Sequence, residues 1–167
     1  QGEENTAEGV QVIRDHTGRI IGLDSTTSGL VMYSYDEAGQ LTGARADGYE
    51  LTWVYEDGLM VAERLYHHNT AEDEATDRVL LGERQFIYNG LNQLLHCTTI
   101  ERPYTVGEGV SAAWVSTEVS YTYNAAGQRT GQKSITSDGV IQERTYTWGI
   151  TGALTTVSDT TTDARGA

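Results

Sequence analysis

The densest set of potential metal ligands in the sequence lies in the polar segment "HHNTAEDEATDR", residues 67–78. Imidazole and carboxylate groups are common ligands of divalent metals. His67 and His68 open the segment, and the acids that follow are Glu72, Asp73, Glu74 and Asp77. Adjacent histidines on a strand point to opposite faces, so they could share a metal only within a loop. We interpret the segment as a solvated hairpin tip and predict no metal site.

The sequence offers little for catalysis. Its 24 Asp and Glu residues allow many carboxylate pairs. However, no pair has the apolar flanks that would raise one pKa, as an acid catalyst of glycoside hydrolysis requires. Cys97 follows His96 directly, and on a strand the two side chains would point to opposite faces. There is no Gly-x-Ser-x-Gly nucleophile motif accompanied by a histidine. We therefore predict no catalytic residues, no cofactor and no enzymatic activity.

Aromatic residues carry the remaining potential for recognition. Tyr and Trp present an apolar ring with a polar atom, which suits sugar or peptide binding on a sheet face. The candidates are Tyr35, Trp53, Tyr123 and Trp148. Their regular placement just before turns favours a structural ladder instead, because aromatic cross-strand pairs stabilise adjoining hairpins. The ladder is the favoured interpretation, and a ligand-binding face is the alternative.

The elements that carry these residues are strands. Residues 49–55 and 115–123 alternate apolar and polar side chains with a period of two, which is typical of a strand with one buried face. No stretch combines a clean helical period with caps, and the Thr, Tyr, Val and Gly content disfavours helix. We predict an all-β protein of about ten to twelve antiparallel strands with almost no helix.

One pattern recurs along the chain. It is "YSYDEAGQLTG" at Tyr33, "FIYNGLNQLLH" at Phe86, "YTYNAAGQRTG" at Tyr121 and "YTWGITGALTT" at Tyr146. Each copy has two aromatic residues separated by a single residue, followed by a turn and a return strand. Because side chains two apart on a strand share a face, we expect these aromatic pairs to line one stripe of the sheet.

The turn within the pattern has its own chemistry. An Asp or Asn side chain can accept hydrogen bonds from nearby backbone N–H groups, and Gly or Asn tolerates the positive φ that closes the loop. The predicted turn residues are Asp36, Gly39, Asn89, Asn92, Asn124, Gly127 and Gly152. Asp-Gly turns alternate with this one and are strong hairpin signals. Sequential hairpins predict an antiparallel meander forming a single curved sheet, a half-shell or a barrel.

The chain of 167 residues suits one domain, or one segment of a larger repetitive protein, and could bury a sizeable core. We predict a polar N-terminal tail over residues 1–8, the repeat domain over 9–158 and a C-terminal tail or linker over 159–167. Residues 67–78 and 101–113 interrupt the repeat spacing and are predicted to be long hairpin loops, where specific binding often concentrates.

Charge and cysteine content limit the partners. A net charge of -13 and a pI near 4.5 disfavour nucleic acid and anionic membrane surfaces. The one cysteine cannot form an intramolecular disulfide. The chain has no apolar run long enough to span a bilayer and no signal-peptide profile at its start, so we expect that any export signal or anchor lies outside it.

At the recurring pattern the chain resembles the YD-repeat family, also called the RHS-repeat family. The family signature runs aromatic, any residue, Tyr, Asp, two residues, Gly, Arg, Leu and often Thr. Residues 33–42 match it nearly throughout, with Gln40 where the family favours Arg. The copy at Tyr121 has Asn124 in place of Asp, and Gln128 and Arg129 in place of Arg and Leu. Through its spacers the resemblance covers roughly residues 9–158. It is specific for architecture rather than for activity.

The resemblance implies a secreted or surface-exposed bacterial protein built of β-hairpins. In larger relatives the hairpins form a shell that encloses a toxin or carries adhesion domains, whereas this chain is far too short to enclose a folded cargo. It also looks like small secreted proteins of gut bacteria with degenerate repeats. The expected function is a non-enzymatic structural or adhesive scaffold, which includes a segment of a toxin-encapsulating shell. The alternative is an accessory surface protein that binds glycan or peptide. Expected partners are a glycan, a surface protein or adjoining repeats.

Overall fold

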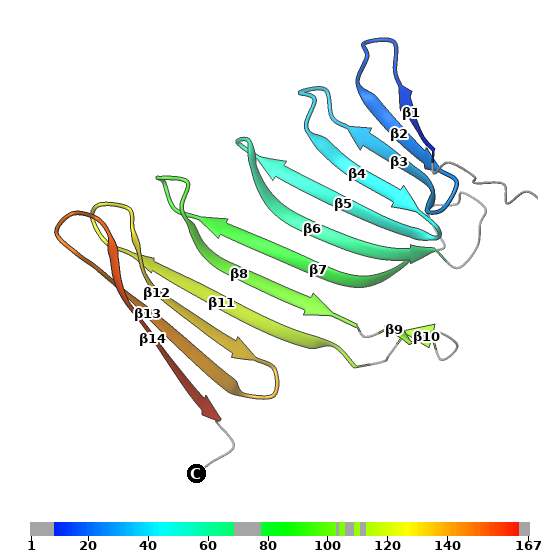
Figure 1. Ribbon diagram of the computed structural model, residues 1–167. Coiled ribbons are helices and arrows are strands. Elements are labelled where there is room, and N and C mark those ends of the chain that lie inside the picture. The colour runs from blue at the N-terminus through cyan, green and yellow to red at the C-terminus, as the bar shows by residue number, and fades with distance from the viewer. Residues whose placement is uncertain (1–8, 69–77, 103, 106–108, 111–112, 164–167) are drawn as a thin grey trace, which may run out of the picture. The chain divides into compact units, whose positions relative to one another are not determined.

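The computed structural model describes residues 9–68, 78–102, 104–105, 109–110 and 113–163 (Figure 1). Every regular element within these ranges is a strand, and they contain no helix. The strands are β1 Val10–Arg14, β2 Ile20–Ser25, β3 Gly29–Tyr35, β4 Leu41–Ala46, β5 Tyr49–Glu56, β6 Leu59–His68, β7 Arg78–Tyr88, β8 Leu94–Glu101, β9 Tyr104–Thr105, β10 Gly109–Val110, β11 Val115–Tyr123, β12 Arg129–Thr136, β13 Val140–Trp148 and β14 Leu154–Asp163.

The strands form an antiparallel meander. The main sheet has 12 strands in the order β1-β2-β3-β4-β5-β6-β7-β8-β11-β12-β13-β14. Each strand pairs with its neighbours in sequence, except that β8 pairs with β11 across the separate β9–β10 hairpin. This confirms the predicted all-β fold of successive hairpins. The order has two ends, β1 and β14, so among the described strands the sheet is open, and the predicted barrel alternative is not formed.

Two predicted segments have different bounds in the structure. Within the loop predicted over residues 101–113, β9 and β10 pair as a small separate hairpin. β14 continues to Asp163, past the point where we expected the C-terminal tail to begin. The other predicted loop is bounded by the end of β6 at His68 and the start of β7 at Arg78.

The recurring turns share one backbone geometry. In residues 36–40 the N–H of Asp36 donates to the carbonyl of Gln40 over 3.0 Å, and the N–H of Gly39 donates to the carbonyl of Asp36 over 3.1 Å. The same pair of bonds closes residues 15–19, 89–93, 124–128 and 149–153. At each of these turns the strand register shifts just before the loop, as expected for a hairpin loop closed by a bulge.

The fourth residue of each recurring turn has a positive φ. The values are Gly18 85°, Gly39 84°, Asn92 60°, Gly127 79° and Gly152 80°. A residue with a Cβ pays a steric cost in this conformation, and Asn tolerates it better than most because its short side chain can hydrogen-bond locally. The Asp-Gly turns at residues 47–48 and 57–58 differ, since both residues of each have positive φ, 45° and 79° at the first and 49° and 79° at the second. The predicted Asp-Gly turn at residues 138–139 departs from this, because only Gly139 has a positive φ, 88°. Positive φ at both residues is the tight two-residue hairpin geometry predicted for Asp-Gly, and it is present at residues 47–48.

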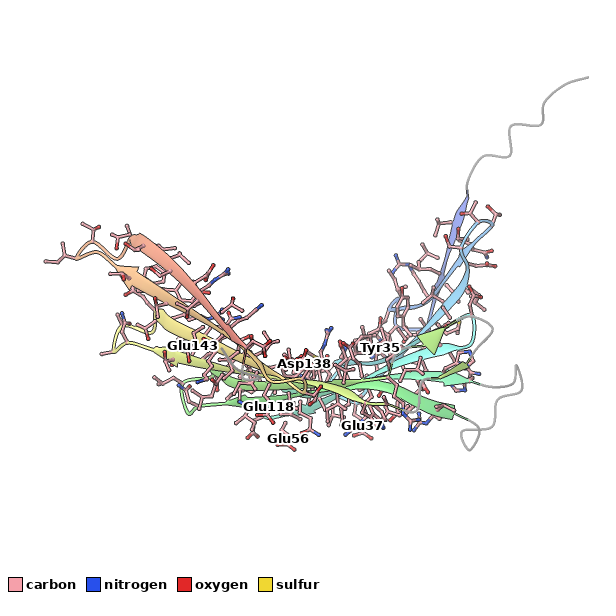
Figure 2. All side chains as sticks on the ribbon, turned by 90° about the horizontal axis from the view of Figure 1, so that it is seen from below. Tyr35, Glu37, Glu56, Glu118, Asp138 and Glu143 are labelled. Atoms are coloured by element: carbon pink, nitrogen blue, oxygen red, sulfur yellow. The ribbon has the colours of Figure 1, made fainter. Side chains whose placement is uncertain are left out.

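The contacts divide the chain into two compact units. One comprises residues 1–54 and 64–80, and the other comprises residues 55–63 and 81–167. In both units side chains project from the two faces of the strands (Figure 2). Along β3 the exposure alternates, with Val31, Tyr33 and Tyr35 half-buried and Leu30 and Met32 exposed. In each unit the strands are therefore held mainly by their neighbours in the sheet, and the described residues enclose little buried interior.

The sizeable core that the chain length allows is not formed among the described residues. The buried apolar side chains there are Ala62 and Leu81, and no large side chain is fully buried. Exposed apolar residues are frequent by contrast, and Ile87 is 57% exposed. Cross-strand contacts and the backbone ladder must therefore supply most of the stability.

Candidate functional site

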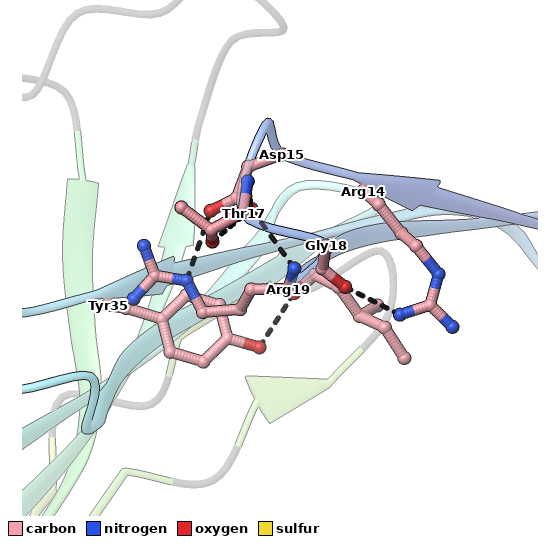
Figure 3. A network of polar contacts seen from close by, with 7 residues as sticks. Arg14, Asp15, Thr17, Gly18, Arg19 and Tyr35 are labelled. Carbon is pink, nitrogen blue, oxygen red and sulfur yellow. Dashed lines mark hydrogen bonds and ion pairs between the residues drawn. The ribbon is translucent and has the colours of Figure 1, made fainter.

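The first recurring turn is held by the Asp15 carboxylate, which lies at the centre of a polar network (Figure 3). Its Oδ1 accepts from the Thr17 hydroxyl over 2.6 Å and from the N–H groups of Thr17 and Arg19 over 2.9 and 3.0 Å. Its Oδ2 lies 3.1 Å from the Arg19 Nε. The Thr17 hydroxyl, with the N–H groups of Arg19 and Thr17, holds the pKa of Asp15 well below its ordinary value of 3.8, against the opposing effect of desolvation.

This lowered pKa predicts an acid-sensitive turn. Because the folded state favours the ionised carboxylate, the stabilisation by Asp15 is complete above its ordinary pKa of 3.8 and is lost progressively as the pH falls from there toward the lowered pKa of the folded state. The substitution Asp15→Asn keeps an oxygen for the backbone N–H groups but has no charge. We expect urea unfolding at pH 6 and pH 3 to show a smaller loss of stability for Asp15→Asn than for the native protein. An equal loss in both proteins would contradict this assignment.

Three of the other recurring turns are capped in the same way, whereas Gly149 has no side chain to cap the turn at residues 149–153. The Asp36 Oδ1 accepts from the N–H of Gln40 over 2.8 Å. The Asn89 Oδ1 accepts from the N–H groups of Leu91 and Gln93 over 2.9 and 3.0 Å. Asn124 makes the equivalent bonds to the N–H groups of residues 126 and 128, each over 3.0 Å. These side chains thus satisfy backbone donors that the loop leaves without a backbone acceptor.

Glutamine side chains link one turn to the next in the second unit. The Asn89 amide donates to the Gln93 Oε1 over 2.8 Å, and the Gln93 Nε2 donates to the carbonyl of Gly127 over 3.2 Å. Asn124, Gln128 and the carbonyl of Gly152 repeat this relay with distances of 2.8 and 3.2 Å. Ala153 occupies the fifth position of the turn at residues 149–153 and has no side-chain amide, so this turn cannot continue the series of hydrogen bonds.

The glutamines are functional positions that the sequence analysis missed. Gln40, Gln93 and Gln128 all occupy the fifth position of a recurring turn, and this recurrence was the available signal. The comparison with the YD-repeat signature marked two of them as departures from Arg. In this chain, Gln93 and Gln128 instead donate hydrogen bonds to a backbone carbonyl of the next turn, and we call these bonds the rungs.

Aromatic side chains form a second set of links, each to the preceding strand. The hydroxyls of Tyr35, Tyr88 and Tyr123 donate to the carbonyls of Ile20, Met60 and Leu94 over 2.7, 2.9 and 2.7 Å. The indole N–H of Trp148 donates to the carbonyl of Arg129 over 2.7 Å. In each case the donor is the second aromatic of its pair. The rings thereby fix the end of one hairpin to the start of the strand beside it.

The aromatic pairs of the second unit share a face. Phe86 lies opposite Cys97, which lies opposite Val119, two residues before Tyr121. Tyr121 in turn lies opposite Gln132 and so shares a face with Arg144, two residues before Tyr146. Since alternate residues of a strand share a face, the pairs beginning at Phe86, Tyr121 and Tyr146 lie on one face, as the repeat predicts.

The proposed ligand-binding aromatics divide between the units. Tyr35 and Trp53 belong to the first unit, and Tyr123 and Trp148 belong to the second. All of them are half-buried. The polar atoms of Tyr35, Tyr123 and Trp148 are engaged with backbone carbonyls, so these residues would offer a ligand mainly their ring surfaces.

The two histidines that begin the acidic segment have separate partners. The His67 ring packs edge-on against Tyr49 with centroids 5.0 Å apart. His68 is buried, and its Nε2 lies 3.3 Å from the Glu50 Oε2, which also accepts from Arg78 over 2.9 Å. Among the described residues there is no cluster of three or more His, Cys, Asp or Glu side chains that could hold a metal. The acids at positions 72, 73, 74 and 77 lie outside the described residues.

His96 and Cys97 also face different neighbours. His96 lies opposite Ile87, and Cys97 lies opposite Phe86 on the adjacent register position. Consecutive residues of a strand project to opposite faces, so the imidazole and the thiol are directed away from one another. This arrangement gives no support to an activated cysteine.

No protein-family model matches the chain, and no curated protein matches it. Solved structures do match. One is the crystal structure of TcdB2-TccC3 without its hypervariable C-terminal region, which is 16% identical with a TM-score of 0.64 and is matched over 87% of this chain and 8% of that chain. The fold is that of a segment of this toxin component.

A second solved structure agrees. The Tc holotoxin pore of Photorhabdus luminescens is 15% identical with a TM-score of 0.58 and is matched over 89% of this chain and 10% of that chain. The chain therefore spans about a tenth or less of the length of these proteins. Within the described residues, no helix has the length and hydrophobicity needed to cross a bilayer.

Proposed function

We propose that this chain is a non-enzymatic structural module, a run of YD-like hairpins that forms part of an extracytoplasmic scaffold. The observation that carries the proposal is the linkage between hairpins. The second aromatic of each of the four copies, and the fifth-position glutamine of two of them, donate to backbone carbonyls of a neighbouring strand or turn. Side chains used in this way build a continuous sheet and are not available as catalytic groups.

The fold similarity supports the same function. Tc toxin components contain the same arrangement of strands over most of this chain. The acidic composition, with its net charge of -13, fits a module that remains soluble while exposing both sheet faces. An exported location and a role in a shell or in adhesion are our proposals for this chain.

The last strand shows where such a scaffold can continue. β14 is exposed along its whole length, from Leu154 to Asp163, and it is one end of the strand order. An edge strand presents a row of backbone N–H and C=O groups to a further strand. Adjoining repeats of a larger protein, or a strand of a surface protein, are the partners that such an edge fits.

The structural use of the aromatics can be tested with the smallest possible change. Tyr123→Phe removes the hydroxyl that donates to Leu94 and keeps the ring, so we expect a loss of about 1 kcal/mol in the free energy of unfolding. Tyr121→Phe is the matched control, because the Tyr121 hydroxyl makes no hydrogen bond within the described part of the chain. Equal stability of the two variants in urea unfolding would remove the structural basis of the proposal.

The extracytoplasmic scaffold itself is tested in the producing cells. We expect the native polypeptide in the secreted or surface fraction, either within a longer repeat protein or bound in a larger assembly. Antibodies against this chain, used on fractionated cells followed by sizing, give the measurement. A free monomer confined to the cytosol would contradict the proposal.

A further inference from the structure

A polar hollow of about 340 Å³ lies over the last three strands of the second unit, β12 to β14. The strand register explains its lining. Gln132, Arg144 and Asp159 are opposite one another across the three strands, and Ser134, Gln142 and Thr161 form the adjacent row. Because the two rows are separated by one intervening residue on each strand, all six side chains share a face.

The charges in this hollow neutralise one another. The Arg144 Nε and Nη2 donate to the two carboxylate oxygens of Asp159 over 2.5 and 2.8 Å. This pairing raises the pKa of Arg144 and lowers that of Asp159, so both remain ionised. Glu143 lies between the two rows on β13, so its side chain projects to the other face, where it is paired with the Lys133 Nζ over 2.8 Å. The site thus offers neither a free positive charge nor a free negative charge.

The remaining lining groups are free to hydrogen-bond. Within the part of the chain that the structure describes, no hydrogen bond is made by the side chains of Gln132, Ser134, Gln142 or Thr161. Two amides and two hydroxyls provide both donors and acceptors, spaced by the separation of about 4.8 Å between neighbouring strands. This contrasts with the glutamines at the turns, whose amides are engaged in the rungs.

Two aromatic residues lie on the same face, next to residues that line the hollow. Tyr121 lies opposite Gln132 on β11, and Tyr146 lies two residues beyond Arg144 on the same face of β13. The Tyr146 side chain also contributes to raising the pKa of Arg144, after the larger effect of Asp159. The Arg129 guanidinium lies 4.4 Å from the centroid of the Tyr121 ring and covers one of its faces. The ring surface that remains next to the neutral polar groups can contact the apolar C–H surface of a ligand whose hydroxyls are hydrogen-bonded.

We propose that this hollow is a binding site for a neutral oligosaccharide. A sugar supplies vicinal hydroxyls that both donate and accept, which matches the amides, the hydroxyls and the paired Arg144 and Asp159. Among the residues that line the hollow, an anionic ligand would find no unpaired cation, and the chain as a whole carries a net charge of -13. A peptide strand would be better served by the backbone groups of the open β14 edge. The hollow's volume lies at the small end of ligand sites, which suits a short stretch of glycan.

The test is a titration of the whole chain with neutral hexasaccharides of glucose, mannose and galactose, followed by NMR and calorimetry. A galacturonate hexasaccharide serves as the charged comparison. We expect at least one neutral glycan to shift the signals of residues in β12 to β14 and the galacturonate to bind at least tenfold more weakly. The double substitution Gln132→Ala and Gln142→Ala should weaken binding at least tenfold. Gln85→Ala, an exposed glutamine on the opposite face in β7, should leave binding unchanged.

Three outcomes would overturn the proposal. They are no binding by any neutral hexasaccharide, equal binding by the double variant and the native protein, and binding of an uncharged Thr-Ser peptide at the hollow without any glycan. Because the substituted side chains are exposed or half-buried and make no hydrogen bonds within the described residues, the double variant should keep its melting temperature. The proposal does not depend on the scaffold function, so either can fail alone.

Discussion

Replacing Leu81 with alanine is expected to lower the free energy of unfolding by about 2–4 kcal/mol. Leu81 is 5% exposed and is one of the two buried apolar side chains among the described residues, the other being Ala62. Truncating it removes apolar burial and leaves a cavity that its neighbours fill only in part. In a sheet with so little interior, this loss is a large share of a typical domain stability.

The matched control is Ile87→Ala, in the same strand. Ile87 is 57% exposed, so its truncation removes little burial, and we expect a change within about 0.5 kcal/mol. Urea unfolding of the three proteins at one pH gives the comparison. Similar losses at positions 81 and 87 would show that the sheet does not depend on the buried contact at Leu81.

Substituting Gly127 with valine should also be costly, by about 1–3 kcal/mol. Gly127 has φ of 79°, a conformation that a β-branched residue adopts only with strain. The added Cβ would also lie 3.2 Å from the Gln93 Nε2, which donates to the Gly127 carbonyl. The substitution therefore strains the turn and disturbs the hydrogen bond from Gln93 to the Gly127 carbonyl.

Gly90→Ala provides the contrast for this prediction. Gly90 lies in a turn of the same kind, but its φ is not positive and a Cβ there would meet no atom within 4 Å. We expect a neutral change or a gain of about 0.4–1 kcal/mol, because alanine restricts the unfolded chain. Thermal and urea unfolding of both variants should show changes of different sign or size. Equal tolerance of Gly127→Val and Gly90→Ala would refute the turn assignment.

The fold could be predicted because its signals are local. Alternation along residues 115–123 identifies a strand, and an acid or amide followed three positions later by glycine identifies the turn, so sequential hairpins follow directly. Asp36 and Gly39 show the cap and the positive φ within one short segment. Nothing distant in sequence is needed to specify such a unit.

The links between repeats could not be predicted in the same way. Whether Gln93 reaches Gly127 depends on how adjacent hairpins are staggered, which bulges and register determine and a single sequence does not reveal. The hollow could not be predicted either. Gln132, Arg144 and Asp159 lie opposite one another only in the observed register of β12, β13 and β14, and this register cannot be read from the sequence. The prediction of a sizeable core from chain length was also wrong. Length determines how much surface a compact chain can bury, but it does not determine whether the chain becomes compact.

The order of strands in the main sheet has a consequence for how such a chain can change over evolutionary time. Every strand pairs only with the strands before and after it in the sheet order, so the contacts of any hairpin are made with its immediate neighbours. In repeat proteins of this kind, stability is approximately a sum of unit terms and nearest-neighbour terms. Duplication or deletion of one hairpin then creates or removes a single junction and leaves the others intact. Such a gene can lengthen or shorten by whole hairpins, and selection acts on each junction almost independently.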